Sequence, residues 1–177
     1  MGAQPKLPFS FVYDGQASEE LLPAWTRTHE TKTLDSVRTR HVFRWTDQKT
    51  RLEVRCVAVV YEDYPVVEWT AYFKNASADN TPLLENIQGL DTRVERGPAG
   101  EFALHGIKGD FCKTNSFEPY CLTLGTNAVE KFAPPSHSGK SCDGPRGWPY
   151  YNLQFPGGGV IVAVGWPGQW SSSFTRD

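Results

Sequence analysis

Four cysteines and four histidines are the residues of this chain whose types suit metal or redox chemistry. The histidines are scattered singly and no two cysteines form a CxxC pair, so the spacing does not favour zinc. Cys56 lies in an alternating apolar run and is expected to be buried as a thiol. A disulfide stays open among the three cysteines in turn-rich sequence, Cys112, Cys121 and Cys142. We expect no metal site and no cofactor.

The composition restricts the class of protein. The chain has 177 residues, which is enough for one domain with a core, and 39% of them are hydrophobic. Its 18 basic and 20 acidic side chains give a net charge of −2 without a block of either sign, which argues against nucleic acid as a partner. No apolar run approaches the ~20 residues that cross a bilayer, so we expect no membrane partner, and the compartment stays open. The 13% aromatic content favours strands over helices.

Alternating apolar and polar residues predict strands in the first half of the chain. In 52–60 the apolar side chains fall on one face, and the same holds for 67–73. The turn residues of 61–65 join these segments, which predicts an antiparallel hairpin. Further strands are expected at 9–13, 37–45, 84–93 and 160–166. One short helix is expected at 18–22, with Ser18 as its N-cap and Pro23 ending it.

The stretch from 97 to 159 differs from the rest because Gly, Pro, Ser and Asn are dense in it. Its aromatic residues argue against disorder, so we expect a loop-rich insertion of ordered loops with a function. The last residues, 171–177, look like the opening of another strand. Many short strands between turns predict an all-β antiparallel sandwich or barrel, as a single domain over 1–177 that is truncated at its C-terminal strand.

Several motifs follow one another in a specific order. They are YPVVEW at 64–69, LLENIQ at 83–88, LHGIKGD at 104–110 with FEP at 117–119, and NLQ, GGGVIVAVGW and GQW between 152 and 170. In this order they resemble the N-terminal β-domain of family 36 glycoside hydrolases, the α-galactosidase-like enzymes. The resemblance covers most of the chain, from about residue 9 to residue 174.

The resemblance implies a galactose mutarotase-like β-supersandwich that precedes a catalytic (β/α)8 barrel in the parent chain. In that family two aspartates of the barrel perform retaining hydrolysis, and nothing here matches the barrel, so no catalytic residue is carried over. The implied role is a non-catalytic module whose loops reach an α-galactoside-type carbohydrate or the interface of a homo-oligomer. The turn at 141–144 and Cys112 depart from the expected pattern, so Cys112 and Cys142 are not counted among the sugar contacts.

Binding such a sugar requires an aromatic face against the ring and polar groups at its hydroxyls. The candidate contacts are Trp148 and Trp170 as aromatic residues, and Gln169, Asp110 and Asn152 as polar ones. Trp166 ends an apolar strand and is expected in the core. Asp110 also suits a structural role in closing a turn.

Two other functions are compatible with the same residues. A free-standing carbohydrate-binding protein would use the loop tryptophans. A mutarotase-like sugar epimerase would need a histidine beside a carboxylate, for which His105 and Asp110 are the available pair. Fold analogy suits each of these functions, so the order of the motifs decides in favour of the hydrolase module.

Overall fold

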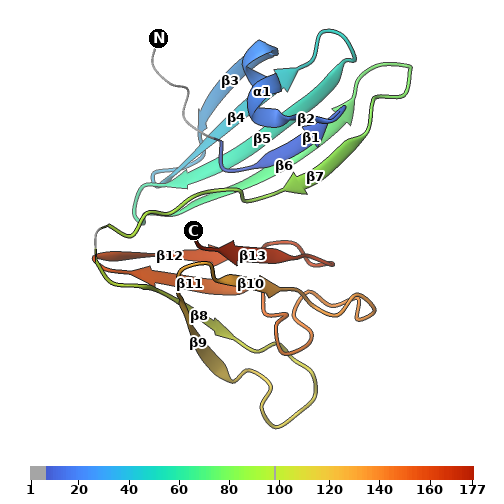
Figure 1. Ribbon diagram of the computed structural model, residues 1–177. Coiled ribbons are helices and arrows are strands. Elements are labelled where there is room, and N and C mark those ends of the chain that lie inside the picture. Colours follow the sequence, from blue (N-terminus) through green and yellow to red (C-terminus); the bar gives the residue numbers. More distant parts are fainter. Residues whose placement is uncertain (1–6, 98) are drawn as a thin grey trace. The chain divides into compact units, whose positions relative to one another are not determined.

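The computed structural model describes residues 7–97 and 99–177. Of the described residues, 48% are in strands and 4% in helices, and they form several antiparallel sheets and no closed barrel. The prediction of an all-β, antiparallel, sandwich-like fold is confirmed. The chain divides into two compact units, residues 1–93 and 94–177, and each is described by itself (Figure 1). The single-domain boundary stays a prediction.

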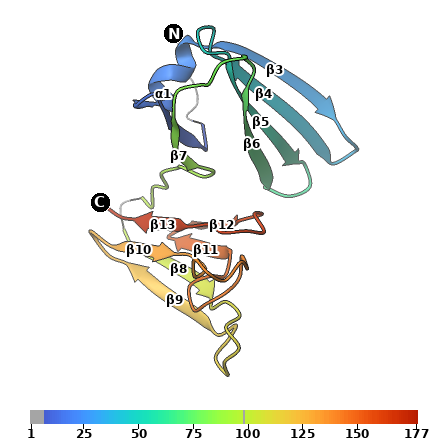
Figure 2. The same ribbon diagram turned by 90° about the vertical axis from the view of Figure 1, so that its right-hand side faces the viewer.

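Unit 1 is built from seven strands and two short helical segments within its described residues. They are β1 (Ser10–Tyr13), β2 (Gln16–Ala17), α1 (Ser18–Leu21), a 3-10 turn (Leu22–Ala24), β3 (Thr26–Thr33), β4 (Arg38–Thr46), β5 (Leu52–Tyr61), β6 (Val67–Asn75) and β7 (Leu84–Gln88). The strand order is β3-β4-β5-β6 in the larger sheet (Figure 2) and β2-β1-β7 in the smaller one (Figure 1). The predicted antiparallel β5–β6 hairpin is confirmed, with Val60 opposite Val67 beside the turn.

The core of unit 1 lies against one face of the β3–β6 sheet. Leu52, Val54 and Cys56 on β5 are buried, as the alternation predicts. They belong to a core with six other large side chains, Phe9, Phe11, Tyr13, Leu22, Trp25 and Trp45. The Phe11 ring of β1 meets the Phe73 ring of β6 edge-to-face at a centroid distance of 5.3 Å. Aromatic contacts therefore join the two sheets of this unit.

β3 is a strand that the alternation does not predict. Its sequence, TRTHETKT, contains no large apolar residue, and all eight residues are exposed. The strand forms because β4 offers a complete edge, along which the two strands pair from Thr26 opposite Thr46 to Thr33 opposite Thr39. Polar and charged side chains suit such an edge since they oppose pairing with a further sheet.

The helix α1 forms where the sequence predicts it, but Ser18 is not its N-cap. Ala17 holds the cap position and makes no side-chain hydrogen bond there. The buried Ser18 hydroxyl instead accepts a hydrogen bond from the Phe11 amide at 3.2 Å. Ser18 therefore ties α1 to β1, and this contact fixes the β1–β2 turn beside the helix.

Unit 2 contains six strands within its described residues. They are β8 (Phe102–Ile107), β9 (Pro119–Leu124), β10 (Val129–Phe132), β11 (Tyr150–Phe155), β12 (Gly158–Ala163) and β13 (Ser172–Thr175). Four of them form a sheet of order β12-β11-β8-β9, and β10 pairs with β13. The core consists of five buried side chains, Leu104, Leu124, Phe132, Tyr151 and Trp170. The strand predicted within 171–177 is β13.

The stretch 97–159 is more regular than the sequence analysis expects, because the four strands β8 to β11 lie in it. The strands have four to six residues each, and turns rich in Gly and Pro separate them, so the alternation in each is too short to be recognised. Two predicted strands are also shorter than expected. β7 ends at Gln88, and β12 ends at Ala163, which leaves the residues that follow it outside the sheet.

Burial raises the pKa of the Cys56 thiol from 9.0 to about 11. Between these two values the folded state keeps the thiol proton and the unfolded chain loses it. The contribution of Cys56 to the unfolding free energy is therefore fully present below pH 9 and is lost as the pH rises towards 11. We expect Cys56→Ala to weaken the pH dependence of the unfolding free energy in this window by up to about 1.4 kcal/mol per pH unit. Urea unfolding at several pH values measures it.

The matched control for this experiment is Cys121→Ala, since Cys121 is an exposed thiol. Its unfolding free energy should follow the same pH dependence as that of the unchanged protein. Equal slopes for the Cys56→Ala and Cys121→Ala variants would contradict the assignment of a buried, protonated Cys56.

Candidate functional site

One end of the β12-β11-β8-β9 sheet gathers most of the residues that the sequence analysis singles out. Gly106 of β8 lies opposite both Tyr120 near the start of β9 and Tyr151 near the start of β11. Tyr150 lies opposite Ala163 at the end of β12. The three loops over 108–118, 133–149 and 164–171 therefore meet this same end of unit 2 (Figure 1).

Backbone hydrogen bonds join two of these loops. The Gly109 amide donates to the Gly144 carbonyl at 3.0 Å, and the Asp110 amide donates to the Cys142 carbonyl at 2.8 Å. Gly109 has no room for a side chain, because a Cβ atom there would collide with the carbonyl oxygens of Cys142 and Gly144. Gly147 is restricted in the same way by a neighbouring carbonyl. These close approaches require glycine and hold the two loops in one arrangement.

An arginine anchors the same loop to β10. Arg146 donates from Nη1 to Glu130 Oε2 at 2.8 Å and to the Lys131 carbonyl at 3.1 Å. Its guanidinium also lies 5.1 Å from the centre of the Phe132 ring. The loop is thus held by polar contacts on β10 as well as by the backbone of 109–110.

Asp110 closes a turn within the first loop. Its Oδ1 accepts a hydrogen bond from the Cys112 amide at 3.2 Å, and Cys112 has a positive φ of 56°. The amides of Phe111 and Lys113 donate to the Ser116 hydroxyl in the same turn. The structural role weighed for Asp110 is therefore present, and the backbone occupies one of its carboxylate oxygens.

Trp170 and Gln169, which follow β12 in the chain, also hold the 133–149 loop in place. The Trp170 ring packs edge-to-face on Tyr151 with centroids 6.2 Å apart, and its Nε1 donates to the Ser141 carbonyl at 2.6 Å. The Gln169 Nε2 donates to the Pro134 carbonyl at 2.7 Å. Trp170 is a core residue, 8% exposed, and offers little of its ring to a ligand.

Four other aromatic side chains are exposed or half-buried at this end of unit 2. Phe117, Trp148, Tyr150 and Trp166 are together termed the aromatic rim. The exposed fractions are 52% for Phe117, 40% for Tyr150 and 63% for Trp166. Trp148 is half-buried and meets the Phe117 ring edge-to-face at a centroid distance of 5.6 Å. The rings of the rim are therefore exposed to solvent, while hydrogen bonds already hold the loops that carry them.

The prediction that Trp166 lies in the core is wrong. β12 ends at Ala163, so Trp166 follows the sheet instead of belonging to it. The Val164 amide donates to the Pro149 carbonyl, which keeps this segment beside the Trp148 loop. The signal that points to this position is the turn sequence that follows it, Pro-Gly-Gln, because a proline there cannot continue a paired strand.

Asn152 and His105 lie within the sheet rather than at the rim. The two residues are opposite each other on β11 and β8, on the face that points away from the core of unit 2. The His105 Nε2 lies 2.9 Å from the Gln154 Oε1. Among the described residues, the side-chain partner of His105 is therefore an amide and not Asp110. The histidine–carboxylate pair that a sugar epimerase would need is not formed there.

Metal-ligating side chains do not cluster in residues 7–97 and 99–177, since no three His, Cys, Asp or Glu groups there could hold an ion together. All four cysteines are free thiols. No helix of the described chain is long and apolar enough to span a membrane. In comparisons with known proteins, no family model matches the chain, and no curated protein matches it.

The close approach at Gly109 predicts a large effect of a single methyl group. We expect Gly109→Ala to destabilise unit 2 by about 1–3 kcal/mol, because the Cβ atom would push apart the backbone of the two loops. The matched control is Gly125→Ala, where a Cβ atom meets nothing within 4 Å, and its effect should stay within about 0.5 kcal/mol. Urea unfolding of both variants measures the difference. Equal unfolding free energies for the two variants would show that the loop backbones move apart without cost, and would contradict the prediction.

Proposed function

We propose that this chain is the non-catalytic N-terminal β-sandwich module of an α-galactosidase-like retaining glycoside hydrolase, and that the aromatic rim of unit 2 contacts an α-galactoside-type carbohydrate. The observation that carries the binding role is the exposure of the rim rings at one end of the sheet, with Trp166 63% exposed. The order of the sequence motifs carries the assignment to the hydrolase class.

The rim offers the exposed aromatic rings that sugar binding requires. A pyranose ring presents apolar C–H groups on its faces, and these pack on aromatic rings, while its hydroxyls need donors and acceptors. Trp148 is steadied by Phe117, so its ring does not have to be ordered when a ligand arrives. The loops beneath are held by backbone hydrogen bonds at Gly109 and Asp110. A preformed surface of this kind loses little entropy on binding.

Under this proposal the catalytic (β/α)8 barrel of the parent chain performs the hydrolysis. Retaining hydrolysis needs two carboxyl groups about 5–5.5 Å apart across the scissile bond, and the resemblance assigns them to a (β/α)8 barrel in the parent chain. The module would supply binding and positioning. The loops over 108–118 and 133–149 are the segments proposed to reach the sugar beside that barrel.

Of the two alternatives, a free-standing carbohydrate-binding protein would use the same rim. The ordered motifs between 64 and 170 favour the hydrolase module over it. The epimerase alternative is disfavoured by a specific contact, because His105 faces the Gln154 amide where acid–base chemistry would need a carboxylate.

Titration with galactose and raffinose tests the rim directly. Amide resonances near residues 148 and 166 should shift with saturation, and Trp148→Ala and Trp166→Ala should each weaken binding about five- to tenfold, because a stacked ring is lost. Tyr64→Ala is the control, since Tyr64 is 67% exposed in unit 1. The carbohydrate role fails if neither sugar shifts these resonances, or if the Trp166→Ala variant binds as tightly as the control.

The module assignment predicts that the chain alone does not hydrolyse an aryl α-galactoside. The release of the aryl group would be followed by absorbance at high protein concentration. Turnover that copurifies with the chain and changes with Trp148→Ala would refute the non-catalytic assignment.

A further inference from the structure

Two histidines that are far apart in the sequence meet on neighbouring strands of unit 1. His29 lies on the edge strand β3 and His41 on β4, which is paired along its length with β3 (Figure 2). The register places His29 opposite Phe43 and Thr31 opposite His41, so these side chains share one face of the sheet. The histidines are scattered in the sequence, and β3, a strand that the alternation does not predict, is what brings these two together.

Three donor atoms converge between these two strands. The His29 Nε2 and the His41 Nδ1 are 3.1 Å apart, and the Thr31 Oγ1 lies 3.4 Å from the first and 3.3 Å from the second. The three atoms therefore form a triangle with nearly equal sides. One face of a tetrahedron around a zinc ion has sides of about 3.3–3.4 Å when the bonds are about 2.0–2.1 Å long. The triangle thus has the size of one face of a zinc coordination sphere.

Aromatic stacking holds the His29 ring in place. The imidazole lies nearly parallel to the Phe43 ring, with centroids 4.1 Å apart and an interplanar angle of 9°. Phe43 stacks in turn on Trp45 at a centroid distance of 6.1 Å, and Trp45 is a core residue with 2% of its surface exposed. His29 is exposed on the edge strand, but its ring continues a stack that begins in the core. A ligand that is ordered in advance loses little entropy when an ion binds.

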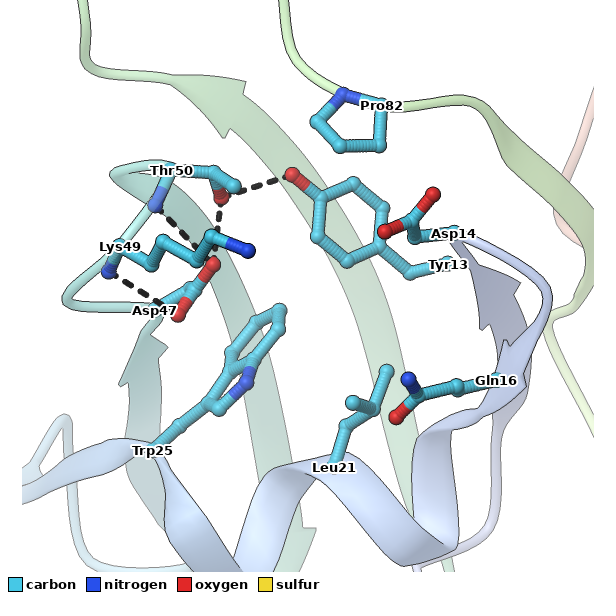
Figure 3. Close-up of a pocket in the computed structure, with 9 residues that line it drawn as sticks. All are labelled: Tyr13, Asp14, Gln16, Leu21, Trp25, Asp47, Lys49, Thr50 and Pro82. Carbon is cyan, nitrogen blue, oxygen red and sulfur yellow. Dashed lines mark hydrogen bonds between the residues drawn. The ribbon is translucent and has the colours of Figure 1, made fainter.

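The turn that leads from β4 into β5 holds β4 at its other end (Figure 3). The Asp47 carboxylate accepts hydrogen bonds from the amides of Lys49 and Thr50, and the Tyr13 hydroxyl donates to the Thr50 Oγ1 at 2.7 Å. Because Tyr13 is a buried residue of β1, these bonds tie the β4–β5 turn to the core of unit 1. They oppose a shift of β4 along β5, so His41 keeps its position beside His29.

The contact between the two imidazoles favours a cation over an anion as the ligand. Two ring nitrogens 3.1 Å apart form a hydrogen bond only if one of them has a free lone pair, so the pair does not present two N–H donors to an anion. A neutral imidazole offers a lone pair to an ion by carrying its proton on the other ring nitrogen. Imidazole nitrogen is a preferred ligand of zinc, and a hydroxyl oxygen is a weaker neutral donor.

We propose that His29, His41 and Thr31 bind one zinc ion on this face of the β3–β4 pair, with the two imidazole nitrogens as strong ligands, the hydroxyl as a weaker third and water at the remaining position. Because its third donor is a hydroxyl, the site differs from a cluster of three His, Cys, Asp or Glu groups. It lies in unit 1 and uses none of the aromatic rim, so it is independent of the proposed hydrolase module.

Titration of the full chain with Zn²⁺ alone tests the site. The amide resonances of His29, Thr31 and His41 should shift with saturation, and calorimetry gives the affinity. His29→Ala and His41→Ala should each weaken this binding about tenfold or more, because a single imidazole does not chelate. Thr31→Val should weaken it about threefold, and Thr31→Ser should restore it, since serine keeps the hydroxyl.

The matched control is His137→Ala, because His137 is an exposed histidine of unit 2. This variant should leave the zinc-induced shifts in unit 1 and their midpoint unchanged. The exposed thiols of Cys112 and Cys121 also attract zinc, but they belong to unit 2, so binding there shifts different resonances. Shifts confined to the neighbourhood of these cysteines, or equal zinc affinities for His41→Ala and His137→Ala at the unit 1 site, would overturn the proposal.

Arg27 distinguishes a cation from an anion as the ligand. Its guanidinium lies over the Phe43 and Trp45 rings, 5.5 Å and 5.8 Å from their centres. Removing this positive charge with Arg27→Gln should strengthen zinc binding about two- to threefold at low salt, because like charges repel. Weaker zinc binding by this variant, or shifts at His29 and His41 that saturate with inorganic phosphate and not with Zn²⁺, would overturn the assignment of a cation.

Discussion

Unit 2 depends on one constraint, which is that the backbone of 109–110 lies directly against the backbone of 142–144. The contact is possible only because position 109 has no side chain. Further contacts hold the loops at this end of the sheet: Arg146 donates to Glu130 on β10, the Trp170 indole donates to the Ser141 carbonyl, and the Trp148 ring packs on Phe117. A cluster of three loops thereby gains a single arrangement without regular secondary structure of its own.

Two carboxylates show why a side chain's surroundings decide its role. Asp110 has a residue type and position that suit sugar binding, yet its Oδ1 already accepts the Cys112 amide. Asp14 lies in a short exposed turn with no motif around it, and no described residue donates a hydrogen bond to its carboxylate. Recognition needs polar groups that the fold has left unpaired, since a bond that is already made gains nothing from a ligand.

The sequence predicts the regular part of the fold better than the sites. Long alternating segments such as that in β5 identify strand and buried face together, because burial on one side imposes period two. Alternation does not predict β3, because an exposed edge strand has no buried face. Trp166 and Trp170 escape it for another reason. Both stand among Gly and Pro, so residue type alone does not separate them. β12 ends at Ala163 and leaves Trp166 outside the sheet, whereas Trp170 packs on Tyr151 in the core.

The difference between those two tryptophans also bears on function. Exposed aromatic rings favour unwanted association, so a ring left 63% exposed four residues from a buried one is a feature that a bound surface would explain. At the rim, the rings are open and the polar groups beneath them are largely occupied by loop contacts. Under the proposed function, the rim is therefore suited to stacking on the apolar face of a sugar, and hydrogen bonds to the sugar hydroxyls would contribute less to its affinity.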